Sequence, residues 1–291
     1  MLRDPGATTA WRSPREANWS TTVAQNVACT SAGLTADACW FPGATTSRYG
    51  PILRHVPPAD DQHRAVDGDR AAAVPTVAID VWSDVVCPWC YIGKRRLEAA
   101  IRALDGEVAV TLSYRPYQLD PTAPRASPVP VAEAYAAKFG GHERAAQIMQ
   151  HVTGIAAEEG IEFRMDRALR ANTMGAHRLL WLAGATGHQG ALKERLLRAY
   201  FCDGLDIGDI DALASCAADV GLDPERIRAF LHSDDGIDEV RAQLAVAADS
   251  GISAVPTYVV DGRWSVPGAQ DPDTFVAVIR RIVAQRHSEI P

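Results

Sequence analysis

The segment Cys87-Pro88-Trp89-Cys90 combines residue types and spacing that indicate redox chemistry. At the start of a helix, a Cys-x-x-Cys spacing brings two sulfur atoms within disulfide distance. Unsatisfied backbone N–H groups at that helix end favour a thiolate. We therefore expect Cys87 to be an exposed nucleophile whose pKa lies below that of a free thiol. Cys90, one turn further along and less exposed, is expected to be the resolving thiol.

Other residues could support this pair. Pro88 suits the first turn of a helix, and Trp89 lies between the two cysteines. Val255 and Pro256 precede a predicted strand, where a cis bond would leave the N–H and C=O groups of Val255 free to bind an extended substrate; an ordinary trans bond is the alternative.

A carboxylate is a candidate proton acceptor for the second thiol. Asp80 alternates onto the polar face of the strand that leads to the cysteines, where it could take the proton from Cys90. A solvated carboxylate at the sheet edge fits the same pattern equally well.

Half of a zinc site is the alternative interpretation of the two cysteines. Such a site needs two more ligands at comparable spacing, whereas Cys202 and Cys216 lie on separate predicted helices. The sequence therefore favours redox chemistry and no metal.

Regular patterns that could position the cysteines begin at Pro75. Apolar residues alternate from Val77 to Val81, which predicts a strand pointing at Cys87. Leu97, Ala100, Ile101 and Leu104 then form the stripe of a helix packed on a sheet. A second alternating run, at 108–114, predicts a parallel strand in a βαβ unit.

The rest of the chain predicts a helical insertion and a return to the sheet. Residues 130–235 show helical periodicity throughout. A helix from Ile237, a hairpin with its turn at Asp261-Gly262 and a last helix starting at Asp271-Pro272 follow. We expect one α/β domain, 75–125 with 237–288, and an all-helical domain, 126–236.

Residues 1–74 lack sustained periodicity and are rich in Ala, Thr, Ser, Pro and Asp. We expect a disordered extension there, or a misassigned start codon upstream of a true start near Val66 or Val74. Cys29 and Cys39 lie in this stretch and receive no role.

Composition excludes several classes of function. The net charge is −7, and no dense cluster of Lys and Arg is present, which argues against nucleic acid as a partner. Apolar stretches are too short to span a membrane, and the first thirty residues lack a secretory signal. We expect a cytoplasmic globular protein.

Four segments carry a family resemblance: IDVWSDVVCPWCYIGKRRLE, YRPYQLDP, NTMGAHRLL and AVPTYVVDGRWSVPGAQ. Over residues 75–285 the sequence resembles the FrnE branch of the DsbA-like oxidoreductases. The resemblance implies a thioredoxin-like fold with a helical domain inserted after the second strand. It further implies that Cys87 and Cys90 are catalytic, that Val255 and Pro256 form a cis-Pro loop, and that Asn172 and His177 are possible groove-lining residues.

Two interpretations of His177 stay open. It shares a predicted helix face with Met174 and Trp181, which favours a hydrogen-bonded histidine packed beneath the insertion over a groove-lining one. Cys202 is expected to be a buried thiol, and Cys216 lies on an apolar stripe that predicts a core position.

The expected activity is thiol-disulfide exchange on protein or small-molecule thiols and disulfides. No cofactor is expected, since the cysteine pair carries the electrons; glutathione or a thioredoxin-type reductant could recycle it. The alternative is a glutathione-dependent isomerase or transferase of the 2-hydroxychromene-2-carboxylate isomerase type, which has the same architecture. Such enzymes need no second cysteine, so the presence of both Cys87 and Cys90 argues against them. A binding protein in which the cysteines are incidental is the third possibility.

Overall fold

The computed structural model describes residues 74–125 and 129–288. The predicted N-terminal extension up to residue 73, with Cys29 and Cys39, lies outside the described residues. Within the described ranges, no helix is both long and apolar enough to cross a bilayer.

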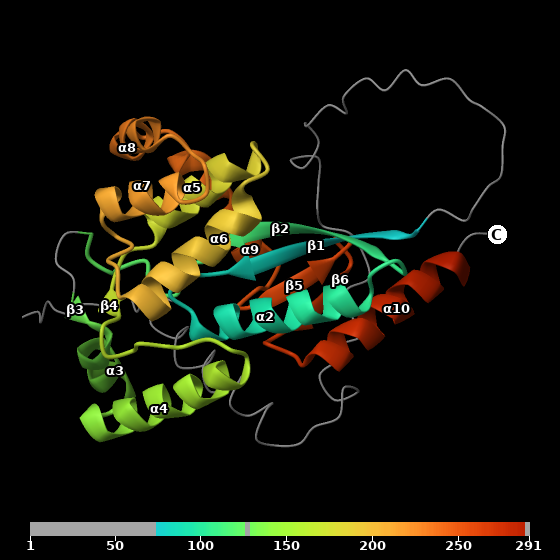
Figure 1. Ribbon diagram of the computed structural model, residues 1–291, viewed down its shortest axis with the longest axis horizontal. Coiled ribbons are helices and arrows are strands. Elements are labelled where there is room, and N and C mark those ends of the chain that lie inside the picture. The colour runs from blue at the N-terminus through green and yellow to red at the C-terminus, as the bar shows by residue number, and fades with distance from the viewer. Residues whose placement is uncertain (1–73, 126–128, 289–291) are drawn as a thin grey trace, which may run out of the picture.

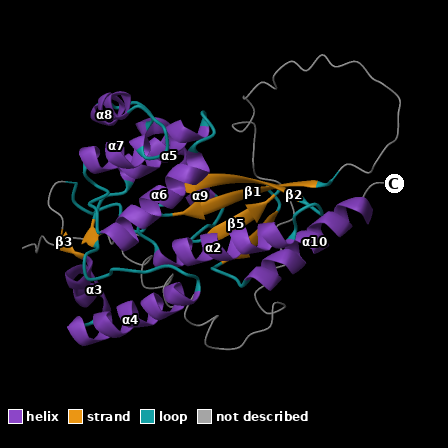
Figure 2. Ribbon diagram, in the orientation of Figure 1, coloured by secondary structure: helices purple, strands orange, loops and turns teal. Residues whose placement is uncertain are grey.

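A four-stranded mixed sheet forms the centre of the fold (Figures 1 and 2). Its strands are β1 (Thr76–Ser83), β2 (Ala109–Pro116), β5 (Thr257–Val260) and β6 (Trp264–Pro267). The order is β2-β1-β5-β6, with β1 and β2 parallel and β5 and β6 antiparallel to their neighbours. Ile79 of β1 lies opposite Leu112 on one side and Val260 on the other. The predicted βαβ unit and C-terminal hairpin are therefore confirmed.

Two helices lie side by side along this sheet, α2 (Pro88–Ala103) and α10 (Pro272–Ser288) (Figure 1). The apolar stripe predicted for α2 is buried at Leu97 and Ala100, and it shares a core with Phe275 and Ile279 of α10. Burial of these side chains stabilises the sheet by roughly 1.5–3 kcal/mol for each large residue. The start of α2 is thereby held at one end of β1.

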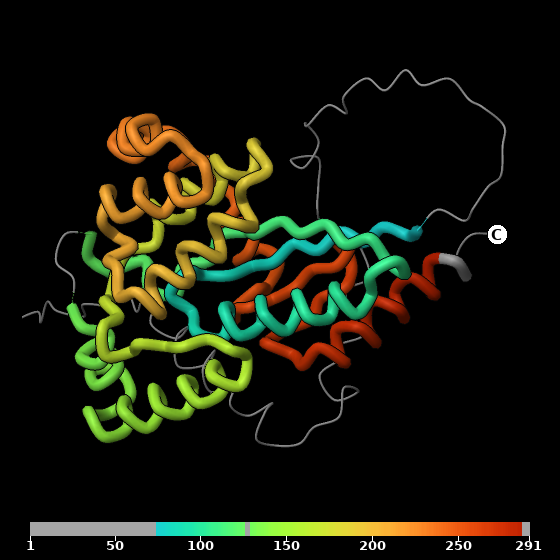
Figure 3. Tube along the Cα trace, viewed as in Figure 1, coloured from blue at the N-terminus to red at the C-terminus, as the bar shows by residue number. Residues whose placement is uncertain are grey.

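The segment between β2 and β5 gathers at that same end of the sheet (Figure 3). Its helices are α3 (Val131–Phe139), α4 (His142–Glu158), α5 (Met174–Gly184), α6 (Gln189–Arg198), α7 (Ile210–Ala218), α8 (Pro224–His232) and α9 (Ile237–Asp249). A short π-helical turn, Ala199–Asp203, extends α6. The apolar side chains of this segment pack in one core with the two cysteines of α2.

The insertion is not wholly helical, contrary to the sequence prediction. Two-residue strands, β3 (Val129–Pro130) and β4 (Leu169–Arg170), pair antiparallel. Strands this short leave no alternating pattern in a sequence, so the helical periodicity around them dominates. The domain boundaries stay a prediction, because α9 contacts both α5 of the insertion and β2 of the sheet.

Capping residues and a glycine in the sequence predicted several helix ends correctly. Asp223 caps α8 by accepting the backbone N–H groups of Glu225 and Arg226, with Pro224 as the first helical residue. Gly221 has φ +90°, the left-handed conformation expected after a helix. Asp271 caps the start of α10 through the N–H of Thr274 at 2.8 Å.

Candidate active site

Cys87 and Cys90 lie at the start of α2, where β1 has just ended. Cys87 is the N-cap residue, with φ −91° and ψ 114°, and Pro88 is the first helical residue. The N–H of Cys90 donates to the carbonyl of Cys87 at 3.1 Å, which closes the first turn. Both thiols are free, so the structure is that of the reduced dithiol.

Both cysteines are enclosed. Cys87 is 2% and Cys90 3% exposed, and Pro88 and Trp89 between them are also buried. The predicted exposed position of Cys87 is therefore wrong. Its pKa is raised well above that of a free thiol, first by burial and then by the neighbouring Cys90 thiol, although the N–H of Cys90 lowers it. The helix start does favour the thiolate, as expected, but loss of solvent outweighs it.

The insertion contributes to this enclosure. Tyr135 of α3 is 3% exposed and packs in the same apolar core as Cys87. Burial raises the pKa of Tyr135, and the charge of a Cys87 thiolate raises it further. The redox pair therefore lies between the thioredoxin-like sheet and the inserted helices.

Val255 and Pro256 lie against the first cysteine. The peptide bond between them is cis, and the thiol of Cys87 donates to the carbonyl of Val255 at 3.6 Å, across 168 residues of sequence. Val255 is completely buried, so its carbonyl is not free for a substrate in this state, contrary to expectation. The close packing of the strand entering β5 against α2 brings these groups together.

Asp80, a candidate proton acceptor for Cys90, is paired with an arginine in the structure. Its Oδ1 atom accepts a hydrogen bond from Nε of Arg115 at 2.8 Å, between adjacent strands, and about a quarter of each side chain is exposed. Because β1 is an inner strand, between β2 and β5, the sheet-edge position of the alternative is wrong, and the carboxylate is ion-paired.

Asp84 is the buried carboxylate near the redox pair, and the sequence analysis missed it. Its side chain is 0% exposed. Oδ1 accepts the N–H of Val85 and Oδ2 the N–H of Leu119, both at 2.8 Å. An Asp directly after a strand, at the turn that precedes a helix, was the available signal, because Asp side chains bond to nearby backbone N–H groups in turns.

His177 of α5 completes the surroundings of Asp84. Its Nε2 atom lies 3.1 Å from Oδ1 of Asp84 and 3.0 Å from the carbonyl oxygen of Tyr117. Both neighbours are acceptors, so Nε2 carries a hydrogen and donates. His177 is thus the hydrogen-bonded, buried histidine of the first interpretation, and it does not line an open groove.

Asn172 shapes the start of α5. Its Nδ2 donates to the carbonyl of Ala123, and its Oδ1 accepts the N–H of Met174, each at 3.0 Å. The groove-lining role implied for it by the resemblance stays a prediction.

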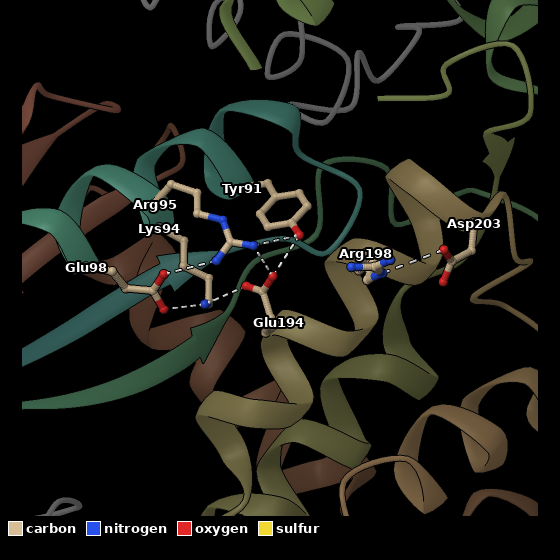
Figure 4. Close-up of polar contacts among 7 residues, drawn as sticks. All are labelled: Tyr91, Lys94, Arg95, Glu98, Glu194, Arg198 and Asp203. Carbon is tan, nitrogen blue, oxygen red and sulfur yellow. Dashed lines mark hydrogen bonds and ion pairs between the residues drawn. The ribbon is translucent and has the colours of Figure 1, made fainter. Parts of the chain in front are cut away.

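An ion-pair network fixes the insertion to the redox helix (Figure 4). The carboxylate of Glu194 on α6 accepts hydrogen bonds from Tyr91 at 2.7 Å and from Lys94 at 2.6 Å, and Arg95 also pairs with it. Burial raises the pKa of Glu194, but Lys94, Tyr91 and Arg95 together lower it below its usual range. Tyr91 directly follows Cys90, so the network holds α6 beside the second cysteine.

The remaining cysteines lie away from this pair in sequence. Cys216 is 1% exposed, which confirms the predicted core position, whereas Cys202 is only partly buried. Within the part of the chain that the structure describes, no group of three or more His, Cys, Asp or Glu side chains is placed to hold a metal ion.

Comparisons with known proteins agree with this geometry. A family model described as a DSBA-like thioredoxin domain matches residues 78–280. The uncharacterized protein YwbO of Bacillus subtilis is 30% identical over 220 residues, which cover 70% of this chain and 96% of YwbO. The crystal structure of a probable DsbA oxidoreductase from Streptomyces coelicolor is 34% identical, with a TM-score of 0.66, over 70% of this chain and 89% of that one.

A solved 2-hydroxychromene-2-carboxylate isomerase shares the fold, with a TM-score of 0.53 at 14% identity over 72% of this chain and 98% of that one. The family match spans both halves of the sheet, the cysteine pair and the helices inserted between them. This protein therefore belongs to the family of DSBA-like thioredoxin-domain proteins, the DsbA-like thiol oxidoreductases.

Proposed function

We propose that the protein is a thiol-disulfide oxidoreductase in which Cys87 is the nucleophile and Cys90 the resolving thiol. One observation carries this proposal: two free thiols lie one turn apart at the start of α2, with the first in contact with the carbonyl of Val255. That arrangement supplies a dithiol that can close to a disulfide and a backbone group beside it that can hold a substrate.

The reaction runs in two exchanges. The thiolate of Cys87 attacks one sulfur of a substrate disulfide, so that a mixed disulfide forms and one substrate thiolate leaves. Cys90 then attacks the Cys87 sulfur, the internal disulfide forms, and the second substrate thiolate leaves. The cysteine pair loses two electrons, the substrate gains them, and the two thiol protons pass to the two substrate thiols. The reverse sequence reduces the internal disulfide.

The contact with Val255 links the first step to substrate binding. A thiol can donate to the carbonyl, but a thiolate cannot. Formation of the nucleophile therefore releases the Val255 carbonyl at the moment when an extended substrate could offer it an N–H group. Protein or small-molecule disulfides are the substrates we propose, with glutathione or a thioredoxin-type reductant to recycle the pair. The cytoplasmic location stays a prediction.

Trapping of covalent adducts tests this assignment. After incubation with an oxidised model substrate, Cys90→Ser should accumulate a mixed disulfide on non-reducing gels, because nothing resolves it quickly. Cys87→Ser should accumulate none and lose turnover. Cys202→Ser is the matched control, since this partly buried thiol lies outside the pair, and it should keep wild-type turnover.

The same assay contains the outcomes that would overturn the proposal. Adducts formed by Cys87→Ser through Cys90 would reverse the two roles. Full activity in both variants would remove the redox assignment. Isomerisation of a glutathione adduct by the wild-type protein, without disulfide turnover, would establish the alternative activity.

A further inference from the structure

The segment that follows β2 belongs to the motif YRPYQLDP, which the mechanism above leaves unused. Tyr117 stands directly after β2 and is 6% exposed. Its hydroxyl donates to the carbonyl of Ser253 at 3.1 Å, across 136 positions of sequence. Ser253 is exposed and lies two residues before Val255. The side chain of Tyr117 therefore connects the end of β2 to the loop that carries the cis bond.

The backbone at Tyr117 is held against the turn that carries Cys87. The carbonyl of Tyr117 accepts Nε2 of His177 at 3.0 Å, and the same nitrogen donates to Oδ1 of Asp84 at 3.1 Å. Asp84 also accepts the N–H of Leu119 on Oδ2 at 2.8 Å, and its backbone carbonyl accepts the N–H of Cys87 at 3.4 Å. Tyr117 is thus fixed to the redox turn through its backbone and to the cis-Pro loop through its hydroxyl.

The Val255 carbonyl lies between two fixed neighbours. On one side the carbonyl of Pro256 accepts the N–H of Gly268 at 2.8 Å, and on the other Tyr117 holds the residue two positions earlier. The bond from Cys87 to Val255, at 3.6 Å, is lost when the thiol ionises, because a thiolate has no hydrogen to donate. The bond from Tyr117 does not involve the thiol, so it is retained during the reaction.

We propose that Tyr117 is a positioning residue, which keeps the Val255 carbonyl beside Cys87 for the backbone of an extended substrate. This inference rests on the proposed function and adds to it the residue that fixes the loop to the redox turn. An acceptor that is fixed before binding spares the substrate complex the entropy of ordering the loop. A disulfide that offers an amide N–H gains from this, whereas a disulfide without amide groups does not.

Two oxidised probes test this role in the first exchange. The Cys90→Ser parent and its Tyr117→Phe derivative both stop at the mixed disulfide, whose formation is followed by mass spectrometry. A symmetric disulfide of a linear peptide offers amide N–H groups, and 2-hydroxyethyl disulfide offers none. In Tyr117→Phe the rate with the peptide should fall by roughly fivefold, the factor for loss of one ordinary hydrogen bond. The loss should appear as a higher half-saturating peptide concentration, and the rate with 2-hydroxyethyl disulfide should not fall.

Tyr258→Phe in the same parent is the matched control. It also removes a buried hydroxyl, on β5 next to the loop, but within the described chain that hydroxyl has no hydrogen-bond partner. It should leave the rates with both disulfides unchanged. Both substitutions keep the aromatic ring, and melting temperatures establish that the variants are folded.

Alkylation of Cys87 by iodoacetamide gives a readout without a disulfide. The Val255 carbonyl binds the protonated thiol and so disfavours the thiolate. Because Tyr117 holds that carbonyl in place, Tyr117→Phe should move the pH profile of alkylation toward lower pH, and Tyr258→Phe should not. A substitution that only lowers the stability of the folded protein would leave this profile where it is.

The outcomes distinguish this inference from the proposed function. Equal rates of parent and folded Tyr117→Phe with the peptide would overturn the role of Tyr117, and so would equal slowing with both disulfides. An equal effect of Tyr258→Phe would also overturn it, because the bond to Ser253 would then not be the cause. Absence of adducts with both disulfides in the Cys90→Ser parent would instead contradict the proposed function.

Discussion

The Nε2 atom of His177 lies 3.1 Å from the carboxylate of Asp84, and the two residues are 93 positions apart in sequence. Asp84 is fully buried in the turn between β1 and the redox helix, and His177 is 3% exposed on α5 of the insertion. Their hydrogen bond therefore joins the thioredoxin-like sheet to the inserted helices directly behind the cysteines. Among the described residues, the other hydrogen-bond donors to this buried carboxylate are the backbone N–H groups of Val85 and Leu119.

Removal of His177 should destabilise the protein. His177→Leu keeps an apolar side chain but leaves Asp84 short of one charge-assisted hydrogen bond, which costs about 1.5–3 kcal/mol. Urea denaturation at neutral pH measures the loss. His151→Leu, at an exposed position of α4, should change the free energy of unfolding by no more than about 0.5 kcal/mol. Equal effects of the two substitutions would contradict a stabilising role for the pair.

Substitutions of Asp84 and of Asp80 should affect the Cys87 thiol differently. Burial and Cys90 raise the pKa of Cys87, and the charge of Asp84 raises it further, so Asp84→Asn should lower that pKa and speed alkylation of Cys87 at neutral pH. Asp84→Asn should also cost about 1–3 kcal/mol of stability, because its amide group meets a backbone N–H where an oxygen accepted one.

Asp80→Asn is the control for Asp84→Asn, since the Asp80 carboxylate is already ion-paired with Arg115. It should leave the alkylation rate of Cys87 unchanged across the pH range, as measured by mass spectrometry of the modified peptide. A larger effect of Asp80→Asn than of Asp84→Asn would restore Asp80 as the carboxylate that acts on the thiols.

The network around Glu194 should make stability depend on pH. Because the pKa of Glu194 is lowered in the folded protein, its contribution is fully present above the unfolded pKa of about 4.3 and is lost as the pH falls through the lower folded value. Glu194→Gln should therefore cost about 1–2 kcal/mol near neutral pH, and the difference from wild type should shrink in acid.

Denaturation curves at a series of pH values measure this difference. The control is Glu225→Gln, whose ion pair with Arg228 is exposed on α8 and should contribute little at any pH. A pH-independent difference between wild type and Glu194→Gln would show that charge at Glu194 does not stabilise the contact between α6 and α2.

Close packing of α2 on β5 should make Gly93 intolerant of a side chain. A Cβ atom there would collide with the hydroxyl of Tyr258 and lie 3.2 Å from Pro256 and Ala269. Gly93→Ala should cost about 1–3 kcal/mol. Gly154→Ala, in α4 with open space around it, should instead stabilise the protein by about 0.5–1 kcal/mol, the ordinary gain of Ala over Gly in a helix.

Tyr258→Phe tests the cause of that cost. Within the described chain the hydroxyl of Tyr258 is buried without a hydrogen-bond partner, so its removal should be tolerated. The double variant Gly93→Ala, Tyr258→Phe should recover part of the loss seen in Gly93→Ala. Additive effects of the two substitutions, measured by thermal unfolding, would exclude the collision as the cause.

Local patterns in the sequence determined much of this protein. Helix and strand periods, and capping residues such as Asp223, depend on interactions within a few residues, so the βαβ start, the C-terminal hairpin and most helices were predictable. The position of Cys87 and Cys90 at a helix start was predictable for the same reason, since Pro88 marks a first helical turn.

The tertiary structure decided which groups surround those cysteines and how far they are exposed. The low exposure of Cys87 depends on the insertion that packs over it. The carboxylate buried behind the cysteines is Asp84 and not Asp80, because the turn after β1 directs the Asp84 side chain toward His177 and Leu119. The contact between α6 and the redox helix depends on the bond of Glu194 with Lys94, which are 100 positions apart. Periodicity assigns a residue to a face of its own helix or strand, whereas the element that covers that face is chosen by contacts between residues about a hundred positions apart.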